Sequence, residues 1–121
     1  MGKHKQKSTY DFIYDLTNAL YNLFDMFYCN TESTVSVSCV NFYNNYKPDD
    51  EVVTFKYKFH IIVNDTLYVY DGWCYEEDIP KIPLGIYSHW LLTNYKLYEG
   101  DGSAFLTLYA CEPNVVRKEK I

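Results

Sequence analysis

The spacing of apolar residues changes near residue 30, from every three or four positions before it to every second position after it. In the first segment the apolar residues form one stripe of an amphipathic helix. This stripe consists of Phe12, Ile13, Leu16, Leu20, Leu23, Phe24 and Phe27. Ser8 or Thr9 can cap the start of the helix, and Asp11 places negative charge near its positive end. The sequence therefore predicts a helix over residues 9–28.

The following segment alternates apolar with polar residues, as in antiparallel strands that are wetted on one face. Residues 33–43 form a first such stretch, and residues 53–63 form the clearest one. In the second stretch the apolar side consists of Val53, Phe55, Tyr57, Phe59, Ile61 and Val63. Its polar side carries Thr54, Lys56, Lys58 and His60. We expect two paired strands whose apolar sides face the helix.

The register of the third strand depends on the turn that begins at Asn64-Asp65. A two-residue loop would place Tyr68 and Tyr70 on the core side. A three-residue loop would place Leu67, Val69 and Trp73 there instead. A shift of one residue exchanges the two faces of a strand completely. We expect the three-residue loop, because it buries the more apolar set.

The rest of the chain is expected to form a loop and a final hairpin. Residues 75–85 are acidic at first and then interrupted by proline, which is typical of a loop. Residues 86–98 and 104–111 are interpreted as two strands joined by a glycine-containing turn. Residues 86–92 can instead be read as a short helix, because the apolar run is too short to separate the two.

These elements predict an α+β fold in which one N-terminal helix packs on an antiparallel sheet of about five strands. The length allows one domain, which we place at residues 9–113. A flexible basic tail is expected at 1–8 and a charged tail at 114–121.

Charge is distributed unevenly along the chain. Between Thr9 and Val115 five lysines accompany 15 carboxylates, a net charge of −10. Such a body repels phosphate backbones, so direct binding of nucleic acid is not expected. The same charge attracts a protein with a basic surface. The candidate partner-binding residues are two acidic clusters and one tryptophan: Asp49, Asp50, Glu51, Trp73, Glu76, Glu77 and Asp78.

No motif for catalysis, a cofactor or a metal is found, and we predict a protein that is not an enzyme. The four cysteines show neither CxxC nor zinc-site spacing. Cys74 with His60 or His89 would form a thiol–imidazole pair only if the fold brought them within hydrogen-bonding reach. Neither a secretory signal nor a membrane span is recognised, so a cytoplasmic protein with reduced thiols is expected.

Residue usage adds an expectation about origin. The chain is rich in Asn, Lys, Tyr, Phe and Ile but has one Arg and three Ala, which indicates an AT-rich genome such as that of a low-GC bacterium, a virus or a mobile element. We expect a small acidic protein-binding module that inhibits a host defence enzyme by occupying its basic site. The alternatives are a small-molecule-binding domain with a cavity between helix and sheet, and a homo-oligomeric accessory protein, for example a homodimer.

Overall fold

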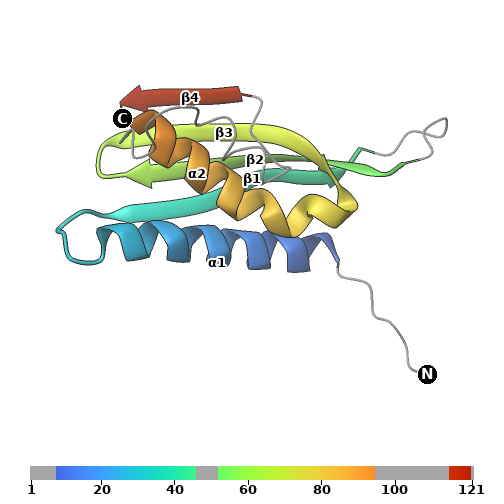
Figure 1. Cartoon of the computed structure of the whole chain (residues 1–121), viewed down its shortest axis with the longest axis horizontal. Helices are drawn as coiled ribbons and strands as arrows, with labels where there is room; N and C mark the ends of the chain where they lie inside the picture. The colour runs from blue at the N-terminus through green and yellow to red at the C-terminus, as the bar shows by residue number, and fades with distance from the viewer. Residues whose placement is uncertain (1–7, 46–51, 95–114, 121) are drawn as a thin grey trace, which may run out of the picture.

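The computed structural model describes residues 8–45, 52–94 and 115–120, which form two layers (Figure 1). One layer is an antiparallel sheet with the strand order β1-β2-β3-β4. The other layer contains both α-helices, which pack on the same face of the sheet. In chain order the elements are α1 (Thr9–Tyr28), β1 (Val35–Asn44), β2 (Thr54–Val63), β3 (Thr66–Tyr75), the 3-10 helix η1 (Glu76–Lys81), α2 (Ile82–Asn94) and β4 (Val115–Lys120). The predicted α+β fold is confirmed, with four strands in the described residues and a second helix.

Helix α1 begins and ends where the sequence predicts. The Ser8 hydroxyl accepts a hydrogen bond from the Asp11 N–H at 3.2 Å, and the Asp11 carboxylate accepts one from the Ser8 N–H at 3.1 Å. This reciprocal pair satisfies two backbone donors that the first helical turn leaves free. Leu16, Leu20 and Phe24 are buried beneath the helix, so its apolar stripe faces the sheet as expected.

Strands β1 and β2 also present the expected faces. The odd-numbered residues of β2 from Phe55 to Val63 are buried against the helices. In β1 the alternation is interrupted by a bulge between Cys39 and Asn41. The extra residue turns Phe42 toward the helices, where it is buried, and places Tyr43 on the opposite side. We call this opposite side, which faces away from the helices, the outer face of the sheet.

The predicted register of β3 is wrong. Val63 pairs with Thr66, so the loop has two residues and Tyr68 and Tyr70 face the helices. Asn64 adopts a left-handed conformation with φ 54°, which asparagine tolerates better than most residues. Its side-chain oxygen accepts a hydrogen bond from the Thr34 N–H at 3.1 Å. The turn chemistry of Asn64 therefore outweighs the preference for burying the more apolar set.

The segment after β3 differs from the expected loop and strand. It forms η1 and then α2, so the strand expected from residue 86 is wrong up to Asn94 and the helical alternative is confirmed. Ile82, Ile86 and Trp90 recur every four residues and are fully buried. Pro83 lies in the first turn of α2, where its missing N–H is not needed. The expected turn at 99–102 and strand at 104–111 lie outside the described residues.

The C-terminal residues expected as a charged tail include a strand. In β4, residues Val115–Lys120 pair antiparallel with β3, from Asp71 to Thr66. The Lys118 ammonium lies 5.6 Å from the centre of the Tyr68 ring, a cation–π contact across the two strands. The sheet therefore includes a strand, β4, in a segment for which the sequence predicts a tail.

Candidate functional site

The second acidic cluster forms the first turn of η1. Glu76 and Glu77 are exposed, whereas Asp78 is ion-paired with Lys81 at 3.2 Å. Carboxylates in the first turn of a helix interact favourably with its backbone N–H groups, which gives the cluster a structural role as well. The first cluster, residues 49–51, lies outside the described residues. Glu76 and Glu77 are thus the two candidate carboxylates that the structure places on the surface.

An apolar groove of about 190 Å³ lies between α1, η1 and the start of α2. It is lined by Phe12, Asp15, Leu16, Ala19, Ile79, Pro80 and Pro83. Asp11 lies one helical turn before Asp15, and Glu76 and Glu77 shortly precede Ile79 in η1. With Asp78 and Lys81 included, five carboxylates and one lysine give this region a net charge of −4. We call it the acidic groove.

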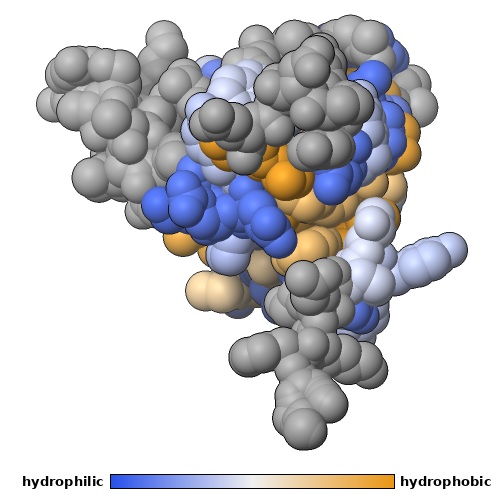
Figure 2. All heavy atoms as spheres, turned by 90° about the vertical axis from the view of Figure 1, so that its right-hand side faces the viewer, coloured by the Kyte–Doolittle hydropathy of each residue, from blue (hydrophilic) through white to orange (hydrophobic). Residues whose placement is uncertain are grey.

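The acidic groove was not predicted from the sequence, because it is formed by elements that are about 60 residues apart. Figure 2 looks onto this end of the molecule and shows hydrophobic surface between hydrophilic patches. Exposed Tyr10 and Tyr14 lie one helical turn apart on the solvent face of α1. Tyr10 and Tyr14 are four positions apart, as are Asp11 and Asp15, and this spacing places each pair on one side of the helix.

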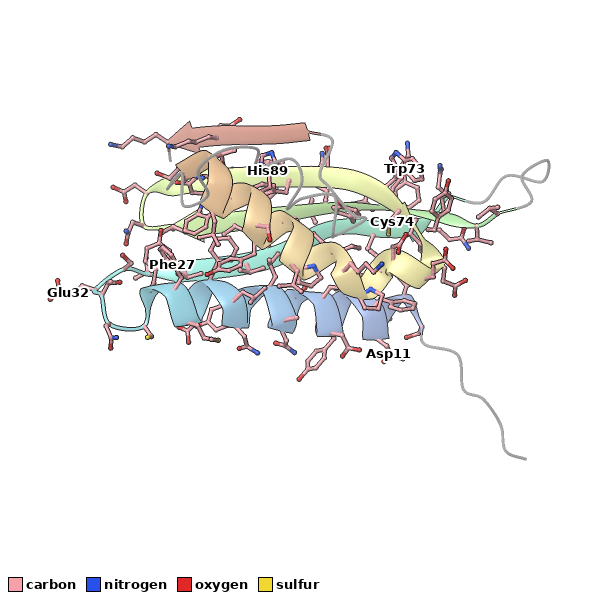
Figure 3. All side chains as sticks on the ribbon, in the orientation of Figure 1. Asp11, Phe27, Glu32, Trp73, Cys74 and His89 are labelled. Atoms are coloured by element: carbon pink, nitrogen blue, oxygen red, sulfur yellow. The ribbon has the colours of Figure 1, made fainter. Side chains whose placement is uncertain are left out.

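Trp73 does not line the acidic groove, because it lies on the outer face of the sheet. Its side chain is 45% exposed, and its ring centre lies 5.4 Å from that of Tyr75. In Figure 3, Trp73 on β3 and Asp11 at the start of α1 lie at the same end of the molecule but on different layers. The structure therefore separates the tryptophan from the acidic residues with which the sequence grouped it.

A second hollow, of about 360 Å³, opens on the outer face next to Trp73. It is lined by Asn41, Tyr43, Lys56, Tyr57, Lys58, Asp71, Gly72 and Trp73. The strand register places six of these residues in two rows across β1, β2 and β3, with the pair Tyr57–Gly72 between the rows. One row is Tyr43–Lys56–Trp73, and the next is Asn41–Lys58–Asp71. We call this site the outer-face hollow.

The thiol–imidazole pair between Cys74 and His60 is not formed. His60 is on the outer face of β2, whereas Cys74 is buried on the face that packs against the helices. Within the described parts of the chain, no group of three or more His, Cys, Asp or Glu side chains could hold a metal ion. None of the described helices is long and apolar enough to cross a membrane.

The environment of Cys39 suppresses its reactivity. Its thiol is half-buried and donates a hydrogen bond to the Asn41 carbonyl at 3.4 Å. Burial raises the pKa of this thiol to about 11, because the thiolate is poorly solvated there. Burial likewise raises the pKa of the Tyr70 hydroxyl well above its usual range.

We predict that iodoacetamide at pH 8 alkylates the exposed Cys29 well before Cys39. The thiolate is the reactive form, and a pKa near 11 leaves on the order of one thiolate per thousand Cys39 side chains at pH 8. Alkylation at Cys39 should therefore keep accelerating from pH 8 to pH 10. Mass spectrometry of peptides from timed samples measures each cysteine separately. Equal rates at Cys29 and Cys39 at pH 8 would contradict the prediction.

No known protein family matches this chain, and no curated protein and no solved structure is significantly similar to it. A function therefore has to be argued from the acidic groove and the outer-face hollow themselves.

Proposed function

We propose that this chain is a protein-binding module that contacts a basic partner protein through the acidic groove. The observation that carries the proposal is an apolar groove whose lining includes Asp15 and part of η1, the helix whose first turn carries two exposed carboxylates. The groove itself is lined mainly by Phe12, Ala19 and proline side chains, and Glu76 and Glu77 are exposed beside it. Protein interfaces commonly combine an apolar centre with a polar rim.

The two parts of the groove have different roles in this proposal. The apolar lining takes up a hydrophobic side chain of the partner, which supplies most of the affinity as water leaves both surfaces. The carboxylates attract lysine or arginine residues around that side chain and thereby raise the association rate. Lys81 opposes them weakly, because its ammonium is already paired with Asp78.

The residue usage indicates an AT-rich genome, and if the source is a virus or mobile element, a host enzyme is the partner that we propose. A basic site on such an enzyme, for example one that normally receives a phosphate backbone, has the charge that matches the groove. Occupying that site would inhibit the enzyme without any chemistry by this chain. Trp73 is not needed for this contact, since it lies on the outer face of the sheet.

We predict that the double substitution Glu76→Lys and Glu77→Lys lowers the association rate with the partner by about tenfold to a hundredfold. The partner is first recovered from the source cells with the wild-type chain and identified by mass spectrometry. Association is then measured with the purified partner by stopped-flow fluorescence at low salt. Added salt should slow the wild type toward the rate of the variant, because it screens the same attraction.

A matched control reverses two charges far from the groove. Asp25 in the last turns of α1 and Glu32 in the following turn are both exposed, and Figure 3 shows Glu32 at the opposite end of the molecule from Asp11 and Trp73. Compared at about 0.15 M salt, where the screening length is about 8 Å, Asp25→Lys with Glu32→Lys should leave the association rate within about threefold of wild type, since Asp25 lies about 15 Å along α1 from Asp15 in the groove. A third variant, Ala19→Phe, fills the groove without changing its charge and should speed dissociation. Unchanged kinetics in both groove variants would refute the proposal.

A further inference from the structure

We propose that the outer-face hollow is a binding site for a free nucleotide, a flat ring that carries a phosphate. This inference does not depend on the acidic groove, because the two sites lie on different faces of the sheet. The hollow combines three kinds of side chain that such a ligand needs: ammonium groups, exposed aromatic rings and neutral or acidic hydrogen-bonding groups.

Lys56 and Lys58 provide the phosphate-binding part. They point to the same side of β2, and their backbone positions are about 7 Å apart, so both ammonium groups can reach one phosphate. Within the described residues neither lysine takes part in an ion pair. Two adjacent lysines without an ion-pair partner among the described residues, in a chain of net negative charge, are suited to stabilise an anion.

Tyr43 and Trp73 provide the surface for the ring. They flank Lys56 on the two neighbouring strands, directly opposite it in the register. Their side chains are 40% and 45% exposed, whereas most large aromatic residues of β2 and α2 are buried. A base stacked on such a ring is stabilised whichever base it is, because every base has an aromatic face. Tyr43 reaches this place only because the bulge in β1 turns it away from the core.

The second row supplies groups for the sugar. Asp71 and Asn41 lie on either side of Lys58, and their oxygen atoms can accept hydrogen bonds from ribose hydroxyls. The hollow, at about 360 Å³, is in the usual size range for small-ligand pockets. One carboxylate against two lysines leaves it with a charge of +1, which suits one phosphate. A polynucleotide would also meet the repulsive carboxylates of the body, so a free nucleotide fits better.

Intrinsic fluorescence offers a direct test, because the chain has two tryptophans in contrasting environments. Trp73 is exposed in the hollow, whereas Trp90 on α2 is fully buried. Titration of the full chain with AMP or CMP should quench the Trp73 emission saturably, with half-saturation in the micromolar to low millimolar range. Adenosine lacks the phosphate, and inorganic phosphate lacks the base and the sugar. Each should therefore bind at least about tenfold more weakly than AMP.

Two double variants separate the ligand contacts from the fold. Lys56→Ala with Lys58→Ala should weaken AMP binding by about tenfold or more, because it removes both charged contacts to the phosphate. Lys118→Ala with Lys120→Ala, which removes two exposed lysines of β4, should leave AMP affinity unchanged. The Trp90 emission reports whether each variant stays folded.

Absence of saturable quenching by AMP and CMP at 5 mM, or equal AMP affinity of the two variants, would overturn the proposal. So would an eight-residue oligonucleotide that binds more than about tenfold tighter than AMP, since that result assigns the site to a strand.

Discussion

Replacing Trp90 with alanine should lower the free energy of unfolding by about 3–5 kcal/mol, a large part of the 5–15 kcal/mol that small domains typically have. Trp90 is fully buried and joins α2 to both α1 and β3. Its ring centre lies 4.6 Å from that of Phe24, 5.2 Å from Phe27 and 6.3 Å from Tyr68. Alanine would remove these edge contacts and leave a cavity that rigid neighbours fill only partly.

Trp73 provides a matched control for this experiment, because Trp73→Ala removes the same atoms from an exposed position. We expect that substitution to cost about 1 kcal/mol or less, since surface changes rarely cost more. Urea denaturation followed by circular dichroism measures both variants on one scale. If Trp90→Ala were no more destabilising than Trp73→Ala, the aromatic cluster around Trp90 would not be the centre of the core.

Strong periodic patterns account for what the sequence predicts correctly. The stripe from Phe12 to Phe27 repeats over about four helical turns, and the alternation from Val53 to Val63 spans a whole strand. Such long patterns allow only one placement of the apolar side. α2 is different because Ile82, Ile86 and Trp90 are surrounded by further apolar residues on every side of the helix. Without a polar face, its period cannot be recognised, and helix and strand remain equally compatible with the pattern.

The candidate site was predicted less well than the fold, for a physical reason. The sequence places Trp73 in one candidate site with Glu76 and Glu77 because interface hot spots favour tryptophan and the carboxylates suit a basic partner. A strand places alternate residues on opposite faces, and η1 then carries the chain toward the helix layer, so neighbours in sequence reach different surfaces. The acidic groove and the outer-face hollow both combine residues from separate elements. No local pattern encodes such a combination before the register is known.

Asn64, in the turn between β2 and β3, fixes the register of β3 and contributes strongly to stability. Substitution of Asn64 by alanine should cost about 2 kcal/mol of stability, as the sum of two losses. A residue with a Cβ is strained at φ 54°, and asparagine tolerates this conformation better than alanine does. Alanine also loses the side-chain oxygen that accepts the Thr34 N–H at 3.1 Å and thereby holds β1 beside the turn.

Two further substitutions at this position separate the losses. Asn64→Gly relieves the strain but removes the hydrogen bond, so it should cost about half as much as alanine. Asn64→Asp keeps an acceptor for the Thr34 N–H and tolerates the left-handed conformation, and it loses only the Nδ2–H donor to the Ser33 hydroxyl at 3.3 Å, so it should stay closest to wild type. Denaturant midpoints of the three variants, at equal m-values, give the order directly. If the alanine variant were more stable than the glycine variant, the left-handed conformation at position 64 would not be what determines the length of the loop. The outer face of β3, and with it the position of Trp73 beside Lys56, would then need another explanation.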